Sequence, residues 1–246
     1  MTTGRHVIVI RDAPTLAEAA AQRVVDAIKS SERAAAICLT GGSTPKRLYE
    51  LLATSSWRGR IPWPRVHWFI GDDRFVPFND PLSNFGMAQR AFLDSCAPAQ
   101  NVHPIRTDAA SPDEAARLYE AELRTFAASR GHPPLFDLTL LGVGPDGHVA
   151  SLFPGYPAAR EVKPWAVGVP QAHVAPFVPR VSLTLPCLGD TKEMLFLAAG
   201  HDKKEILSRV FSGEDLPASH AHANKGETVW LIDEAAAPPD IPRSFS

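Results

Sequence analysis

The stretch AAICLTGGSTPKRLYELL, residues 35–52, contains the structural unit that decides the fold. Its first apolar run is typical of a buried strand that ends near Thr40. Two glycines then turn the chain, and Pro45 begins a helix that Ser43 or Thr44 can cap with a side-chain oxygen. The stretch is therefore predicted to be a strand followed closely by a helix.

The same pattern recurs along the chain. Apolar runs rich in branched residues alternate with helical segments, and the runs are HVIVI, AAICLT, VHWFI, FDLTLLGV, EMLFLAA and TVWLI. Thr15 with Glu18 and Ser111 with Glu114 match the capping box, and Pro112 occupies a first helical position. This alternation indicates an α/β protein with three α/β/α layers and a mostly parallel, Rossmann-like sheet covered by helices on both faces.

The composition limits the class of partner. The chain of 246 residues is 45% hydrophobic and 21% charged, with a formal net charge of -2, which provides no field for a polyanion. No repeat or low-complexity block divides it, so residues 1–246 are predicted to form a single domain. The N-terminal apolar run is too short for a signal peptide or a membrane span, and three widely spaced cysteines favour free thiols. We therefore expect a cytoplasmic protein that binds neither nucleic acid nor membrane; its oligomeric state is open, and a monomer is compatible with the sequence.

Four predicted strand ends carry polar residues, and in parallel sheets ligands bind at the carboxyl ends of the strands. At the first, Gly41 and Gly42 allow close approach to the backbone, and the helix amides near Ser43 and Thr44 point outward. This arrangement favours a phosphate site. A capped helix start without a ligand is the alternative.

The second strand end is followed by GDDRFVPFNDPLSN, in which Asp72, Asp73 and Arg74 come directly after an apolar strand. Three charges at this position indicate a polar site, and Arg74 is suited to bind substrate oxygens. A divalent metal on the two aspartates is the alternative, but no further ligand cluster accompanies them, and we expect no metal. The sequence leaves open whether the aspartates contact substrate or only hold Arg74.

The third strand end is LLGVGPDGHVASLFPG, residues 140–155, whose three glycines have the G-x-G-x-x-G spacing of dinucleotide sites. That fingerprint opens the first β-α-β unit and leads into a long helix, whereas this segment lies in mid-chain and is interrupted by prolines. The glycines instead predict a tight turn. It presents Asp146 and His148, a carboxylate and an imidazole that can share a proton pathway.

The fourth strand end, EMLFLAAGHDKKEIL, leads into a helix for which Asp202 is the predicted N-cap. Lys203 lies in the first turn, where a cation opposes the helix dipole unless an anion is nearby, so Lys203 is a predicted phosphate ligand. Arg180 is a second. His220 and His222 have no third ligand nearby and are predicted to be surface residues rather than a metal pair.

Four segments together, LTGGSTPKRLYELL, GDDRFVPFNDPLSN, LLGVGPDGHVASLFPG and RVSLTLPCLG, closely resemble the 6-phosphogluconolactonase family, and the resemblance covers most of the chain. It implies hydrolysis of 6-phospho-D-glucono-1,5-lactone to 6-phosphogluconate in the oxidative pentose phosphate pathway, on a layered α/β/α sheet and without a metal or organic cofactor. The related glucosamine-6-phosphate deaminases have a glutamate five residues after the histidine, where this chain has Phe153. A deaminase/isomerase and a non-catalytic sugar-phosphate sensor are the alternative functions.

Hydrolysis of a lactone needs an activated water, a stabilised oxyanion and a proton for the leaving ring oxygen. The predicted catalytic roles are a general base for His148, orientation of the imidazole for Asp146, and contact with the lactone carbonyl for Arg74. A direct base role for Asp146 is the alternative, and Ser151 is predicted to be a turn residue rather than a nucleophile. The phosphate is predicted to bind Gly42, Ser43, Thr44, Lys203 and Arg180, with Asp72 as a further substrate contact.

Overall fold

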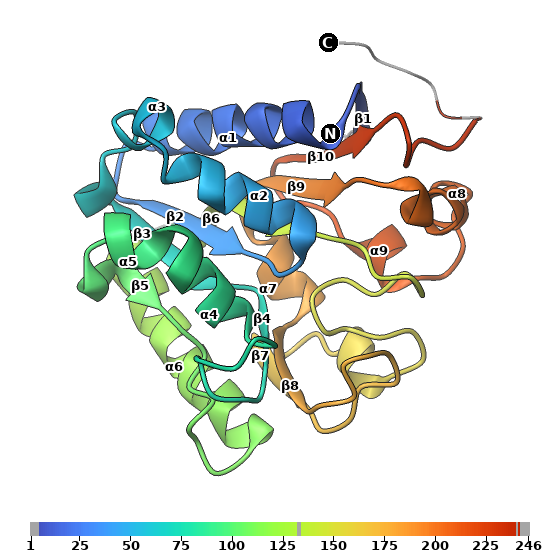
Figure 1. The fold of residues 1–246 in the computed structure, drawn as a ribbon. Helices are drawn as coiled ribbons and strands as arrows, with labels where there is room; N and C mark the ends of the chain where they lie inside the picture. The colour runs from blue at the N-terminus through green and yellow to red at the C-terminus, as the bar shows by residue number, and fades with distance from the viewer. Residues whose placement is uncertain (1–4, 132–133, 240, 242–246) are drawn as a thin grey trace.

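The computed structural model describes residues 5–131, 134–239 and 241, and a seven-stranded sheet forms its centre (Figure 1). The sheet order is β1-β10-β9-β6-β2-β3-β5, and every neighbouring pair is parallel. The strands are β1 (Arg5–Ile10), β2 (Ala35–Leu39), β3 (Val66–Ile70), β5 (Val102–His103), β6 (Phe136–Leu141), β9 (Thr191–Ala198) and β10 (Glu227–Asp233). Each predicted apolar run forms one of these strands; the short β5 was not predicted.

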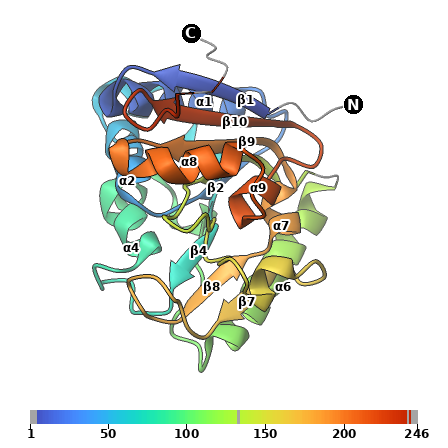
Figure 2. The same cartoon turned by 90° about the vertical axis from the view of Figure 1, so that its right-hand side faces the viewer.

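Helices cover both faces of the sheet. Figure 2 looks onto the edge where the strand arrows end and shows α2 and α4 on one side and α6 and α7 on the other. The helices are α1 (Ala13–Lys29), α2 (Ser43–Leu52), α3 (Ser55–Arg58), α4 (Asn84–Ala88), α5 (Asp94–Cys96), α6 (Pro112–Arg130), α7 (Leu185–Gly189), α8 (Lys204–Phe211) and α9 (Pro217–His220). The predicted three-layer α/β fold is therefore confirmed. No helix in the described part of the chain is long and apolar enough to cross a membrane.

A second, three-stranded sheet was not predicted. It has the order β4-β8-β7, with antiparallel pairing throughout, and consists of β4 (Asp72–Arg74), β8 (Arg180–Leu183) and β7 (Ala166–Val169). β4 follows directly on the end of β3, so this sheet extends from the carboxyl edge of the large one. The charged triplet that the sequence places directly after an apolar strand forms a short strand of its own.

Three of the predicted helix starts are wrong. Asp12, not Thr15, caps α1, because its carboxylate accepts a hydrogen bond from the Thr15 amide at 2.8 Å. Gly42 is the N-cap of α2, since the helix begins earlier than Pro45 suggested. A short 3-10 turn moves the start of α8 past Asp202 to Lys204. The capping residue Ser111 of α6 was predicted correctly, and its hydroxyl accepts from Glu114 N at 3.1 Å.

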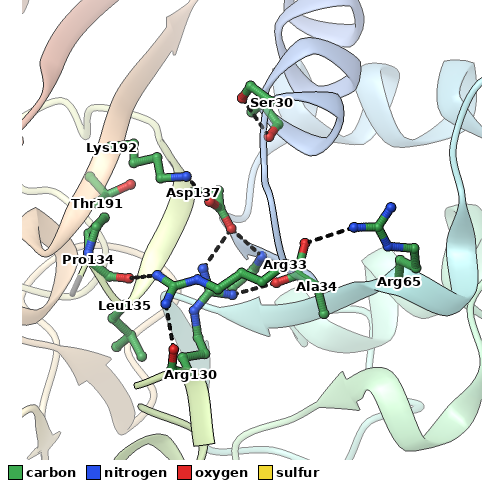
Figure 3. A network of polar contacts seen from close by, with 12 residues as sticks. Ser30, Arg33, Ala34, Arg65, Arg130, Pro134, Leu135, Asp137, Thr191 and Lys192 are labelled. Atoms are coloured by element: carbon green, nitrogen blue, oxygen red, sulfur yellow. Dashed lines mark hydrogen bonds and ion pairs between the residues drawn. The ribbon is translucent and has the colours of Figure 1, made fainter. Parts of the chain in front are cut away.

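The amino ends of β2, β6 and β9, here called the amino edge, surround a buried carboxylate (Figure 3). Oδ2 of Asp137 accepts hydrogen bonds from Arg130 Nη2 at 2.8 Å and from Ala36 N at 2.9 Å, and Oδ1 lies 2.8 Å from Lys192 Nζ. Burial alone raises the pKa of Asp137, but the bonds from Lys192, Ala36 and Arg130 together hold it below its usual value. This cluster ties three strands to the end of α6.

Candidate active site

A cavity of about 220 Å³ lies at the opposite, carboxyl edge of the large sheet. The sheet order reverses there: the chain passes from β2 to β3 on one side, whereas β6 and β9 lie on the other. Such a reversal is where open α/β sheets bind ligands. The walls are Thr40, Gly41, Gly42, Asp72, Arg74, Asn84, Gly142, Val143, Gly144, Pro145, His148, Ala150, Arg180 and Lys203.

The structure brings most of the predicted site residues into this one cavity. All four predicted strand ends contribute to the walls, and so does Arg180 of β8. Ser43 and Thr44 lie in the first turn of α2 but are not among the wall residues, and Asp146 contacts the cavity only through His148. Other wall residues, among them Asn84 and Ala150, were not predicted to belong to the site.

The glycine-rich segment after β6 is shaped by the imidazole of His148. A Cβ on Gly144 would lie 2.0 Å from Cε1 of that ring, so only glycine leaves room for it. Gly147 has a φ of 87°, a backbone conformation that other residues rarely adopt, and a Cβ there would also lie 2.9 Å from Leu216. The G-x-G-x-x-G spacing therefore seats a histidine in this protein.

His148 and Asp146 form a hydrogen-bonded pair. Nδ1 of His148 lies 2.5 Å from Oδ1 of Asp146, and the His148 amide donates to the same oxygen at 3.2 Å. Burial alone raises the pKa of Asp146, but the hydrogen bond and charge of His148 lower it below its usual value. This carboxylate is therefore ionised. Because Nδ1 is engaged, Nε2 is the ring nitrogen of His148 that is available to a substrate.

The strand β4 divides its three charged residues between two sides, as a strand must. Asp72 and Arg74 line the cavity, whereas Asp73 turns away from it and is not exposed to solvent. Burial raises the pKa of Asp73 to about 6, although its hydrogen bonds work in the other direction. Outside β4, its donors are Asn84 N at 2.6 Å, Phe85 N at 3.1 Å and Ser83 Oγ at 3.0 Å. Asp73 therefore holds the start of α4.

Asp72 is fixed from two directions. Ser151 Oγ donates to its Oδ2 at 2.6 Å, and Asn84 Nδ2 donates to its Oδ1 at 3.3 Å. Ser151 itself is fully buried, so its hydroxyl orients the carboxylate. Asn84 lies within the segment GDDRFVPFNDPLSN that the sequence singled out, but nothing in that segment distinguished it from its neighbours.

Arg74 and Arg180 lie directly opposite each other on β4 and β8. Arg74 Nη1 donates to Leu82 O at 2.6 Å and Arg180 Nη2 to Pro176 O at 2.8 Å. Within the described residues neither guanidinium forms an ion pair, and the Nε atoms of both are buried without a partner. Like charges directly across a strand pair are unfavourable, so this arrangement indicates a place for an anion.

Lys203 approaches the same cavity from the end of β9. Its Nζ donates to Val143 O at 3.1 Å and lies 3.7 Å from Asp202 Oδ2. The bond to Val143 holds the ammonium at the end of β6, beside the turn that presents His148. Lys204 begins α8 and is not a wall residue.

One further polar residue, His173, was missed by the sequence analysis. Its Nε2 lies 2.8 Å from Oδ2 of Asp146, on the side of the carboxylate away from His148. His173 lies in the irregular segment between β7 and β8. No motif marks it, because a contact between residues 27 positions apart depends on how two loops pack.

A parallel sheet whose carboxyl edge carries a histidine–aspartate pair and several cations in one cavity defines an α/β protein with a site for a small anion. Residues 11–230 match the family described as glucosamine-6-phosphate isomerases/6-phosphogluconolactonase. The chain belongs to this family, which confirms the resemblance seen in its four motifs.

The relatives support this assignment at high coverage. The chain is 39% identical to a 6-phosphogluconolactonase from Streptomyces coelicolor, covering 100% of this chain and 98% of that protein. It is 41% identical to one from Synechocystis sp., covering 81% and 82%. A solved 6-phosphogluconolactonase from Trypanosoma cruzi is similar with a TM-score of 0.82 and 28% identity, covering 96% and 97%. A monomeric glucosamine-6-phosphate deaminase, 21% identical with a TM-score of 0.79 over 94% and 98%, shares the fold.

Proposed function

We propose that this cavity hydrolyses 6-phospho-D-glucono-1,5-lactone to 6-phospho-D-gluconate, a step of the oxidative pentose phosphate pathway, with His148 as the general base. The observation that carries the proposal is that the His148–Asp146 pair lies in one cavity with Arg74, Arg180 and Lys203. The names of the relatives that match along most of the chain support the same substrate. The free cysteines fit the cytoplasmic setting in which this pathway operates.

The chemistry begins with a water molecule at Nε2 of His148. The imidazole takes a proton from the water as the water oxygen attacks the lactone carbonyl carbon. The electrons of the carbonyl double bond move onto the carbonyl oxygen. Asp146 balances the positive charge that forms on the ring, as the carboxylate does in hydrolytic triads. His148 then returns the proton to the ring oxygen as the carbon–oxygen bond breaks, which leaves a carboxylic acid that ionises.

Arg74 supplies the stabilisation of the oxyanion. Its guanidinium lines the cavity and is already oriented by its bond to Leu82 O, so it needs little reorganisation when negative charge develops on the carbonyl oxygen. Asp72, held by Ser151 and Asn84, is placed to accept hydrogen bonds from sugar hydroxyl groups.

The phosphate binds at the other end of the substrate. Lys203, Arg180, Gly42 and the first amides of α2, at Ser43 and Thr44, provide the cations and N–H groups for about -1.5 to -2 charges. The binding energy of this unreactive end orients the lactone carbon against the water. Removing a phosphate contact is therefore expected to lower kcat/KM for the phosphorylated lactone but not for the unphosphorylated one.

The residue at the deaminase glutamate position is apolar in this chain. Phe153 is fully buried, and its ring meets the His148 ring edge-on with centroids 4.8 Å apart. It provides no carboxylate to assist ring opening, which favours the lactonase over the deaminase.

The test uses two neighbouring lysines. The phosphorylated lactone is generated in situ and its decay followed by NMR, with glucosamine 6-phosphate assayed for ammonia release in parallel. Lys203→Met is expected to lower kcat/KM for the phosphorylated lactone by about 10- to 100-fold, the size of a lost charged hydrogen bond, and to leave unphosphorylated gluconolactone unaffected. Lys204→Met is the matched control and should change neither. Equal losses on both lactones would contradict the phosphate assignment, and ammonia release without lactone decay would contradict the function.

A further inference from the structure

We propose that His173 is a positioning residue for the hydrolysis: it anchors the free oxygen of Asp146 and so fixes the carboxylate that orients His148. The inference rests on the proposed function and deepens it. It adds a third member to the histidine–aspartate pair, from a different part of the chain.

The carboxylate of Asp146 lies between two imidazoles. His148 Nδ1 binds Oδ1 at 2.5 Å, and His173 Nε2 binds Oδ2 at 2.8 Å. An ionised carboxylate only accepts hydrogen bonds, so both nitrogens are donors, and Nε2 of neutral His148 is left as the proton acceptor that general base catalysis needs.

A second anchor matters because the first is local. Asp146 and His148 are only two residues apart on one turn, and a carboxylate held at one oxygen can still rotate about its χ2 torsion, which is broad for aspartate. The bond from His173 comes from the segment between β7 and β8 and closes that rotation. The plane of the carboxylate, and with it the direction of the imidazole, is then determined by two segments.

His173 is itself held in place although 37% of its side chain is exposed. Its neighbours Ala172 and Val174 pack with Phe153 in a small apolar cluster, and Ala172 is only 1% exposed. The His173 ring meets Phe153 edge-on at a centroid distance of 4.9 Å and lies 5.2 Å from Tyr156. Phe153 thus packs against both imidazoles.

His173 is not a wall residue of the cavity, so its substitution should affect kcat rather than substrate binding. The ligands of the phosphate and of the sugar are unchanged without it, so substrate affinity is retained. The orientation of the general base is lost, so the chemical step slows. The expected signature is a lower kcat at constant KM.

Two substitutions separate the hydrogen bond from the packing. His173→Phe keeps a ring against Phe153 and Tyr156 but has no donor, whereas His173→Gln places an amide N–H near the position of Nε2. His173→Phe is expected to lower kcat about tenfold, at the lower end for a residue that holds a functional histidine's partner, with KM unchanged. His173→Gln restores most of the lost turnover. In an Asp146→Asn background, His173→Phe causes no further loss, because the two residues act as one unit.

The alternatives are distinguishable. Three results would each overturn the role of His173 without affecting the proposed lactonase function. They are a wild-type kcat in His173→Phe, equal losses of kcat in His173→Phe and His173→Gln, and a loss from His173→Phe that is as large in the Asp146→Asn background as in the wild type. If the wild type itself fails to hydrolyse the lactone, the role of His173 can still be tested by a measurement that needs no substrate. Imidazole ¹⁵N spectra of the free protein should show His148 as a single Nδ1–H tautomer in the wild type and an average of two tautomers in His173→Phe; identical spectra would overturn the inference.

Discussion

The amino edge and the carboxyl edge of the sheet contain the same kinds of buried charge, but they pair them differently. At the amino edge, Asp137 is paired with both Arg130 and Lys192, so the buried carboxylate finds its counter-charges within the chain. At the carboxyl edge, Arg74 and Arg180 face each other and donate only to backbone carbonyls. Charges satisfied by the chain contribute to stability, whereas charges left for a ligand contribute to function at some cost in stability.

The largest expected effect separates activity from stability at the carboxyl edge. His148→Gln removes the proposed base and should lower kcat by about 10²- to 10⁴-fold. The free energy of unfolding should change by less than about 1 kcal/mol, because the ring bonds to one partially exposed carboxylate. Turnover by NMR and urea denaturation measure the two quantities. A wild-type rate in this variant would remove the functional half of the comparison.

The mirror-image variant lies at the amino edge. Asp137→Asn leaves Arg130 without its buried counter-charge and is expected to cost about 3–5 kcal/mol in the free energy of unfolding, with kcat unchanged in the folded fraction. Lys192→Met is the control, because this partner is 44% exposed and its loss should cost about 1 kcal/mol or less. If Asp137→Asn unfolds no more easily than Lys192→Met, the amino edge is not the stabilising cluster described above.

The contributions of Asp73 and Asp137 to the free energy of unfolding should change with pH in opposite directions. The pKa of Asp73 is raised to about 6, so its contribution to stability is fully present below the unfolded value of about 3.9 and is lost as the pH rises through 6. The pKa of Asp137 is lowered, so its contribution is present above about 3.9 and is lost as the pH falls.

Asp73→Asn should therefore be most destabilising near pH 4 and less so at pH 7.5, whereas Asp137→Asn should be most destabilising at pH 7.5. For Asp73→Asn we expect a change of about 1–3 kcal/mol across this range, whereas the effect of Asp137→Asn should stay nearly constant there and fall only below about pH 4; denaturation of each variant and the wild type at several pH values, down to about pH 3, measures both. The same slope in both variants would mean that the two carboxylates have similar environments in the folded protein.

The sequence was sufficient to predict the large sheet and the location of the site. Apolar strands that alternate with helices must lie parallel, and their carboxyl ends then meet at one edge. For this reason Gly42, Asp72, Arg74, His148 and Lys203, which are far apart in the chain, could be expected in one place.

The details that depend on non-local pairing could not be predicted. β4 is three charged residues long, and its partner β8 lies about a hundred positions away, so no periodicity marks the pair. The register between them is what turns Asp73 away from the cavity and places Arg180 beside Arg74. The contact of His173 with Asp146 has the same origin.

The arginine pair yields the smallest expected effect and the most direct comparison of the edges. Arg180→Met loses one hydrogen bond to Pro176 O, about 0.5–1.5 kcal/mol, and the attraction of Asp72, while it relieves the repulsion from Arg74, so the free energy of unfolding should fall by only about 1 kcal/mol. Arg130→Met, a similar change at the amino edge, removes a buried partner of Asp137 and should cost distinctly more. Inorganic phosphate should raise the Tm of the wild type and of Arg130→Met by similar amounts and that of Arg180→Met by less, because Arg180 lines the cavity and Arg130 does not. If the two methionine variants lose equal stability and respond equally to phosphate, Arg180 is a structural residue like Arg130, and the difference between the edges lies in His148 and Lys203 alone.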